Sequence, residues 1–348
     1  MANESRPLVL VTGATGYIAG HCIRELFEHG YRVRGTVRSL KDPSKTEHLR
    51  RIAAAAGGTI ELVEADLTSD RGWREAVAGC TYVQHVASPF PAEVPKHEDD
   101  LIRPAVDGAL RVLRAAAETP SVKRVVMTSS VAAVAFGHTE GNGKVRTEAD
   151  WSVAENCDPY PKSKTLAERA AWEFVKGLPQ ERHFELAVIN PGFVLGPLLN
   201  NDQGTSGELI RKLMVREMPA CPEIGFAPVD VRDVALAHRL AMERPEAPGN
   251  RYICAGDHLW TQDMAKVLAD EFNPRGYKIP TGHLPYWVMW IFARFDKSVK
   301  LALGFVGRKE LVSCAKAKRE LGWTMRPVRE SIIDTGRTMI EQGVVPAR

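Results

Sequence analysis

The sequence predicts an α/β fold: a doubly wound parallel sheet with a smaller, discontinuous lobe in the second half of the chain. Short apolar runs alternate with stretches of helical period through the first half, as in β-α-β units. The first run, residues 8–11, passes directly into a glycine-rich turn and then into a helical stretch that ends near Gly30. The chain has 348 residues, 44% of them hydrophobic, and can therefore bury a large core.

The glycine-rich turn, Thr12 to Gly20, predicts a dinucleotide site of the Rossmann type. Gly13 permits the tight turn, Gly16 lets the backbone approach a pyrophosphate, and Ala19 stands where a third small residue lets the helix pack against the strand. The alternative interpretation is an ordinary turn. The position of the glycine-rich turn between a strand and a helix favours the nucleotide site.

The second strand, residues 31–37, indicates which nucleotide binds. An NAD site of this type usually ends this strand with Asp or Glu to hold the ribose 2′-hydroxyl, but here Arg38 follows the strand. A guanidinium suits a 2′-phosphate, and Lys41 and Lys45 add positive charge nearby. We therefore expect NADPH/NADP+ as the cofactor, with a solvated basic loop as the alternative.

Further strands are expected at residues 59–65, 82–86, 124–127 and 184–189, and a helix at 101–117. In a doubly wound sheet, ligands lie beyond the carboxyl ends of the strands. Five residues that follow strands should therefore converge on one cleft: Gly13, Arg38, Asp66, Ala87 and Ser130. Ser130 would hydrogen-bond a substrate oxygen there, although a serine after a strand is often only a turn residue.

Tyr160 and Lys164 are four residues apart, so a helix that begins at Tyr160 places both side chains on one face. A phenol has a pKa near ~10, and a neighbouring ammonium favours its ionised form. We expect Lys164 to lower the pKa of Tyr160, so that Tyr160 can protonate a substrate oxygen. The spacing is common by chance, and a solvated helix start is the alternative interpretation.

These features resemble the extended short-chain dehydrogenase/reductase superfamily. Within it, four segments are similar to those of dihydroflavonol, cinnamoyl-CoA and aldehyde/ketone reductases: YPKSKTLAE at 160–168, NPGFVLGP at 190–197, VRDVALAH at 231–238 and RYIC at 251–254. The resemblance spans nearly the whole chain. It implies that Ser130 contacts the carbonyl oxygen, that Tyr160 donates the proton, and that Lys164 tunes Tyr160 and holds the nicotinamide ribose.

The resemblance also implies a set of cofactor contacts. They would fall on Gly13, Thr15, Gly16, Tyr17, Ile18, Arg38, Lys45, Asp66, Leu67, Val86, Ala87, Ser88, Tyr160, Lys164, Pro191 and Val194. The substrate pocket is expected beside these segments, at Phe90, Ala135, Phe136 and Phe193. Because these side chains are apolar, the pocket should prefer compact or aromatic carbonyl compounds to polyhydroxylated ligands such as flavonoids and sugar nucleotides.

Two positions differ from the named plant reductases. Ala135 stands where dihydroflavonol reductases carry an asparagine. Asn156-Cys157-Asp158-Pro159 precedes Tyr160, where cinnamoyl-CoA reductases carry Asn-Trp-Tyr-Cys. Both differences favour a substrate other than a dihydroflavonol or a cinnamoyl-CoA.

The expected domain organisation is a nucleotide-binding domain and a discontinuous lobe. Residues 1–190 should form the NADP-binding domain, completed by about 226–258, while 191–225 and 259–348 form mainly the substrate-binding lobe. Asp233 is expected to be a helix cap or an ion-pair partner. The apolar segment 284–295 is too short to span a bilayer, so we expect a helix packed over the substrate cleft, with an interface or membrane-surface helix as the alternative.

Charge and cysteine content exclude several classes of function. The formal net charge is +3 with no polybasic patch, so neither nucleic-acid binding nor stable membrane insertion is expected. The six cysteines are scattered, without metal-ligand spacing, and His85 and His238 lie in apolar segments as core histidines, so no metal is expected. Reduced thiols and the absence of a recognisable signal peptide favour a cytoplasmic monomer or homodimer.

Together these observations predict an NADPH-dependent carbonyl reductase, or alcohol dehydrogenase, that transfers hydride to an aldehyde or ketone with Tyr160 as proton donor. An NAD-dependent nucleotide-sugar epimerase or 3β-hydroxysteroid dehydrogenase would use the same residues. Arg38 disfavours that alternative. A non-enzymatic NADP-sensing regulatory protein is disfavoured because Ser130, Tyr160 and Lys164 are all present.

Overall fold

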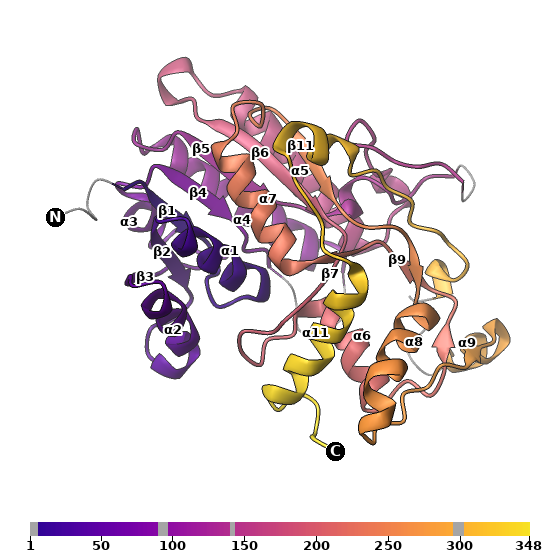
Figure 1. Cartoon of the computed structure of the whole chain (residues 1–348). Helices are drawn as coiled ribbons and strands as arrows, with labels where there is room; N and C mark the ends of the chain where they lie inside the picture. Colours follow the sequence, from indigo (N-terminus) through magenta and orange to yellow (C-terminus); the bar gives the residue numbers. More distant parts are fainter. Residues whose placement is uncertain (1–5, 90–96, 140–142, 295–302) are drawn as a thin grey trace.

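A seven-stranded parallel sheet forms the centre of the computed structural model, which describes residues 6–89, 97–139, 143–294 and 303–348 (Figure 1). Its strands are β1 Leu8–Val11, β2 Arg32–Val37, β3 Ile60–Glu64, β4 Tyr82–His85, β5 Arg124–Thr128, β6 Glu185–Pro191 and β11 Arg251–Cys254. They lie in the order β11-β6-β5-β4-β1-β2-β3, and every pairing is parallel. The predicted doubly wound sheet is confirmed, and its strand order reverses between β1 and β4.

Helices cover both faces of this sheet (Figure 1). One face carries α1 Tyr17–Glu28, α2 Glu47–Ala55 and α7 Val231–Glu243, and the other carries α3 Trp73–Val77, α4 Asp99–Ala117 and α5 Pro159–Lys176. Successive side chains of β1 point to opposite faces of the sheet. Val9 and Val11 therefore belong to the core on the α1 side, and Leu8 and Leu10 to the core on the α4 side. A strand buried on both faces must be apolar at every position, as residues 8–11 are.

A second group of elements lies beside the sheet, mostly after β6. It contains β7 Phe193–Leu195, α6 Gly204–Met214, β8 Cys221–Pro222, β9 Gly225–Phe226, β10 Pro228–Asp230, β12 Leu259–Trp260, α8 Thr261–Phe272, β13 His283–Leu284, α9 Tyr286–Phe292 and α11 Val328–Glu341. Ile210, Leu268 and Met339 bring α6, α8 and α11 together in a separate core (Figure 1). Between these elements, α7 and β11 return the chain to the main sheet.

Short turns of 3-10 or π helix connect the larger elements: η1 Pro43–Thr46, η2 Val131–Ala133, η3 Ala154–Asn156, η4 Gln180–Arg182, η5 Asn273–Arg275, η6 Leu303–Phe305 and η7 Ala317–Leu321. Two residues of η7, with Trp323 after it, pack into the core beneath α7 although they lie within 259–348. The proposed division into a nucleotide-binding domain and a substrate lobe stays a prediction.

The helix expected within 284–295 is present as α9, but most of its large side chains face solvent. Tyr286, Trp287 and Trp290 are 54%, 65% and 47% exposed, whereas Met289 is buried. The expected packing of this helix over the substrate cleft stays a prediction. In the described parts of the chain, no helix has the length and apolar composition needed to cross a membrane.

The link between the main sheet and the second group of elements passes through Gly192, between β6 and β7. A Cβ at this position would lie 2.0 Å from the carbonyl oxygen of Ala227 and 3.0 Å from the Cβ of Ala255. The N–H of Phe193 donates to the same Ala227 oxygen at 2.8 Å, so the two backbones are held close together. Only glycine fits this approach without a backbone shift.

Gly192→Ala should therefore lower the free energy of unfolding by about 1 to 3 kcal/mol, because the added methyl group forces the two segments apart. Gly282→Ala is the matched control, since a Cβ there would meet nothing within 4 Å. Urea denaturation of both variants measures the difference. Equal stability of the two variants would contradict the proposed constraint.

Candidate active site

The predicted catalytic hydroxyl groups meet where β5 ends and α5 begins. Ser130 directly precedes η2, and its Oγ accepts the N–H of Ala132 at 3.1 Å. Tyr160 lies in the first turn of α5, which begins with Pro159, a residue that suits the first helical position. The Ser130 side chain is close enough to the Tyr160 hydroxyl to lower its pKa through hydrogen bonding. The structure thus brings together the two groups that were predicted to hold one substrate oxygen.

Lys164 follows Tyr160 by one helical turn, with its Nζ 6.0 Å from the centroid of the Tyr160 ring. Burial lowers the pKa of Lys164 to about 8, and the carboxylate of Glu168 opposes that change. The pKa of Tyr160 is raised from its ordinary value, first by burial and then by Glu310, while the hydrogen bond with Ser130 lowers it. The predicted lowering of the Tyr160 pKa by Lys164 is therefore wrong for this structure.

The pKa of Tyr160 is raised because its hydroxyl group is removed from water. The residue as a whole is 39% exposed, so the desolvation acts on the hydroxyl end and not on the entire ring. Lys164 lies over the ring, and its own charge is disfavoured by burial. Helical spacing correctly places both groups on one face, but the spacing does not determine how deeply that face is buried.

A buried ion pair holds α5 one turn beyond Lys164. The Oε1 of Glu168 accepts from the Nε of Arg251 at 2.5 Å, with the two side chains 0% and 8% exposed. The Nδ2 of Asn190, in β6, donates to the Oε2 of Glu168 at 2.8 Å and to the carbonyl of Ser130 at 3.1 Å. These bonds join α5, β6, β11 and the backbone of Ser130 in one network.

The remaining donors of Arg251 are also engaged. Its Nη1 donates to the carbonyls of Glu148 and Asp150 at 3.2 and 2.9 Å, and its Nη2 approaches the carbonyl of Ala133 at 3.4 Å. The ring of Trp151 lies against the guanidinium, 3.7 Å from the carbon to the ring centroid. A buried charge that is this fully hydrogen-bonded is stable only while all of these segments remain in place.

The glycine-rich turn lies at the point where the strand order reverses, between β1 and β4. Gly13 has φ +64°, and a Cβ there would lie 2.9 Å from the Cβ of Ala87. The Oγ1 of Thr12 accepts the N–H of Ala87 at 3.0 Å and is 2.9 Å from Nδ1 of His85. The N–H of Gly13 donates to the Oγ1 of Thr36 at 2.9 Å. Neighbouring strands thus hold the turn in one conformation.

The start of α1 suits a phosphate. Gly16 is the N-cap, no side chain caps the helix, and the first turn carries no acidic residue. Uncapped N–H groups at the positive end of a helix dipole bind anions well. The hydroxyl of Tyr17 donates to the carbonyl of Gly196 at 2.9 Å, and Ile18 packs against the core, so these two residues offer a cofactor their backbone groups.

The predicted residues for the adenosine end also lie along this edge of the sheet. Arg38 is exposed directly after β2, and Asp66 follows β3. Hydrogen bonds from Thr68 lower the pKa of the Asp66 carboxyl, and the charge of Arg38 contributes to the same change, so the two side chains are neighbours. Lys41 and Lys45 are exposed in the loop after β2. Arg38 is therefore available to a phosphate, and the following loop adds two exposed lysines.

The other predicted cofactor residues differ in exposure. Thr15, Leu67, Val86 and Ala87 are half-buried, Ser88 is exposed, and Pro191 and Val194 are buried at the β6 end and in β7. On the substrate side, Phe90 lies outside the described residues. The Phe136 ring, one residue after Ala135, meets the Phe305 ring edge to face at 6.1 Å, and the Phe193 ring stacks on Phe226 at 4.2 Å.

Two polar residues of this region, Glu310 and His258, were not identified from the sequence. Burial raises the pKa of the Glu310 carboxyl to about 8, and a hydrogen bond from the Ala227 backbone opposes the change. His258 accepts the N–H of Glu310 at its Nδ1 at 3.1 Å. Glu310 lies in a stretch without regular structure, so no periodic pattern marks it as buried.

The two histidines predicted to lie in the core, His85 and His238, and Asp233 have structural roles. His85 and His238 are buried, and desolvation lowers their pKa to about 3 and about 4, so both are neutral core residues. Asp233 accepts the backbone N–H of Arg326 at 2.7 Å and forms an ion pair with its side chain. Within the described ranges, no group of three His, Cys, Asp or Glu residues could hold a metal ion.

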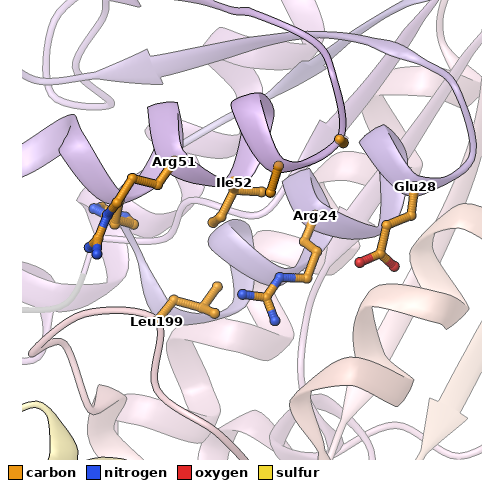
Figure 2. Close-up of a pocket in the computed structure, with 8 residues that line it drawn as sticks. Arg24, Glu28, Arg51, Ile52 and Leu199 are labelled. Carbon is orange, nitrogen blue, oxygen red and sulfur yellow. The ribbon is translucent and has the colours of Figure 1, made fainter.

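A cavity of about 440 Å³ lies elsewhere, between α1, α2 and the loop that carries Leu199 (Figure 2). Its lining is Arg24, Glu28, His48, Arg51, Ile52, Ala55, Ala56 and Leu199. None of these residues belongs to the predicted catalytic or cofactor set. We therefore place the site at the carboxyl ends of the strands, where the hydroxyl pair and the glycine turn lie, and not in this cavity.

Several known proteins are similar to this chain in sequence or in structure. Residues 9–255 match the model of the NAD dependent epimerase/dehydratase family. Cinnamoyl-CoA reductase 1 of Petunia hybrida is 37% identical over 350 residues, 99% of this chain and 96% of that protein. Cinnamoyl-CoA reductase CAD2 of Medicago truncatula is 42% identical over 253 residues, 70% and 74% of the two chains. The crystal structure of yeast methylglyoxal/isovaleraldehyde reductase Gre2 complexed with NADPH is similar with a TM-score of 0.77 at 30% identity, covering 97% of this chain and 99% of that one.

Glu168→Gln should lower the free energy of unfolding by about 3 to 5 kcal/mol, because it leaves the buried guanidinium of Arg251 without a counter-charge. Glu271→Gln is the control: its ion pair with Arg275 is exposed, and its loss should cost about 1 kcal/mol or less. Denaturant unfolding at pH 7 measures both. A Glu168 variant as stable as the Glu271 variant would show that the network does not anchor α5.

Proposed function

The chain belongs to the NAD dependent epimerase/dehydratase family, and from that premise we propose that it is an NADPH-dependent reductase that converts an aldehyde or ketone into an alcohol. The observation that carries the proposal is the proximity of the Ser130 and Tyr160 side chains, where α5 contacts η2 at the carboxyl ends of the strands. The same sheet edge carries the glycine turn, so a carbonyl oxygen held by the two hydroxyl groups would lie near a cofactor seated on that turn.

In this proposal the residues of the chain orient the substrate and supply the proton. NADPH, when bound, supplies the hydride. Ser130 and Tyr160 donate hydrogen bonds to the carbonyl oxygen and stabilise the negative charge that develops there. Since its pKa is raised, Tyr160 keeps its proton at neutral pH and releases it only to an oxygen that has become basic. The protonated amine of Lys164 adds positive charge beside this site.

Several features support NADPH as the cofactor. The uncapped start of α1 offers N–H groups to a pyrophosphate, and Gly13 keeps the turn close to β4. Arg38 takes the place where NAD sites carry an acid, and Lys45 lies seven residues further along the same loop. Two of the similar solved structures, both Gre2 proteins, were determined as NADPH complexes.

The substrate in this proposal is a carbonyl compound of moderate size. Phe136 and Phe305 form an apolar wall that suits aliphatic or aromatic groups. Ala135 and residues 156–159 lack the side chains expected for dihydroflavonols and cinnamoyl-CoA, although similar proteins are named cinnamoyl-CoA reductases. A panel of aldehydes, ketones and a cinnamoyl-CoA in an NADPH oxidation assay would rank these classes directly.

Tyr160→Phe should reduce kcat by ~100-fold or more while leaving the affinity for NADPH nearly unchanged, because it removes the proton donor but keeps the ring. Tyr286→Phe, on the exposed face of α9, is the control and should behave like the parent protein. Lys164→Ala should reduce both kcat and NADPH affinity. Steady-state kinetics and NADPH fluorescence titration separate the two effects, and near-normal turnover by Tyr160→Phe would rule out its role as the acid.

Arg38→Ala should weaken NADPH binding by about 1.5 to 3 kcal/mol and leave NADH binding almost unchanged, since only NADPH carries the 2′-phosphate. Arg182→Ala is the control. It removes the same charge from exposed η4, which precedes β6 and therefore lies at the amino-terminal ends of the strands. Dissociation constants for both nucleotides provide the comparison. If the preference between the nucleotides did not change in the Arg38 variant, another group would have to select the cofactor.

A further inference from the structure

Glu310 is held rigidly beside the proposed site by backbone hydrogen bonds. The N–H of Gly307 donates to the carbonyl of Glu223 at 2.8 Å, and the N–H of Arg146 donates to the carbonyl of Leu311 at 2.9 Å. The N–H of Glu310 itself donates to the Nδ1 of His258 at 3.1 Å. Its position is therefore set by three separate parts of the chain.

The carboxyl group of Glu310 has one oxygen that the protein does not use. Within the described residues, its Oε1 is buried and has no hydrogen-bond partner, while the Ala227 backbone is close enough to lower the pKa of the carboxyl group. Buried polar atoms are nearly always paired, so an unpaired one in a cleft indicates a place where a ligand atom would bind.

The neighbours of the Glu310 carboxyl show where it lies relative to the proposed site. The carbonyl of Ala227 accepts the N–H of Phe193, next to Gly192 and the predicted nicotinamide-flanking residues Pro191 and Val194. On the other side, the Glu310 charge raises the pKa of the Tyr160 hydroxyl, which requires that the two groups be close. Glu310 thus lies between the proton donor and the segment that begins the substrate lobe.

At neutral pH this carboxyl is protonated, because burial raises its pKa to about 8. The titratable groups that face it are Tyr160 of α5 and His258, and Lys309 precedes it in the chain. A protonated carboxyl is a hydrogen-bond donor, and an ionised one accepts only. The group is therefore a neutral hydrogen-bond donor at pH 7.

We propose that Glu310 is a specificity-determining residue, and that its carboxyl group donates a hydrogen bond to a second oxygen of the substrate, such as a keto, ester or hydroxyl oxygen close to the reacting carbonyl. This inference rests on the proposed function, which places the reacting carbonyl at Ser130 and Tyr160. It also revises the expectation of a pocket without polar partners, because one buried donor distinguishes substrates that carry a second oxygen from those that lack it.

The test compares 1-phenylpropane-1,2-dione with 1-phenylpropan-2-one, which differ by one carbonyl oxygen next to the reacting carbon. The ratio of their kcat/KM values is measured for the parent protein, Glu310→Gln and Glu310→Leu with NADPH at pH 7. Comparing ratios between proteins cancels the different intrinsic reactivities of the two compounds. Calorimetric titration of both compounds into each protein saturated with NADP+ gives an affinity ratio that does not require turnover.

Glu310→Leu should lower the preference for the dione about tenfold in both ratios, and Glu310→Gln, which keeps a donor, should change it less than threefold. Between pH 7 and pH 9.5 the preference of the parent protein should fall as the carboxyl ionises, and that of Glu310→Gln should stay constant. An unchanged preference in Glu310→Leu by both measurements would overturn the proposal. If no carbonyl compound supports NADPH oxidation, the proposed function fails, and the affinity ratio alone decides the role of Glu310.

Discussion

The buried ion pair between Glu168 and Arg251 is the contact on which the geometry of the site depends. Glu168 lies one turn after Lys164, and Arg251 begins a strand 83 residues later in the chain. Because neither charge is stable alone in this environment, α5 can take its position only when β11 has joined the sheet. Asn190 extends the coupling to the backbone of Ser130. The arrangement of the two hydroxyl groups that we propose as catalytic is therefore a consequence of complete folding and not of α5 alone.

The burial that fixes this geometry also determines the acid-base properties of the site. Desolvation lowers the pKa of Lys164 and raises that of Tyr160, so the two groups, which have similar ordinary pKa values, differ more in acidity here and Lys164 loses its proton first. A phenol that holds its proton firmly is well suited to donate it when negative charge appears on a bound oxygen. The environment thus favours Tyr160 as a donor in the direction of carbonyl reduction.

The substrate side of the cleft combines segments that are far apart in the chain. Phe136 follows η2, Ala227 precedes β10, and Phe305 and Glu310 come from the stretch before η7. The glycine at 192 permits the close approach of Ala227 to the link between β6 and β7. Since these segments carry few regular elements, side-chain substitutions there can change the recognised carbonyl compound while the sheet and the glycine turn remain intact.

Local pattern alone was sufficient to predict the parallel sheet, the glycine turn at Gly13 and the shared helix face of Tyr160 and Lys164. Each is encoded by spacing over a few residues: apolar runs for buried strands, a turn that needs glycine, and four residues for one helical turn. Glu168 follows Lys164 by four residues and so lies on the same helix face, but no local sequence pattern marks Arg251 as its partner. The raised pKa of Tyr160, the buried donor at Glu310 and the exposed aromatic face of α9 were decided only by the tertiary structure. Periodicity specifies which residues share a face, whereas burial and long-range contacts specify how deep that face lies and which charges meet there.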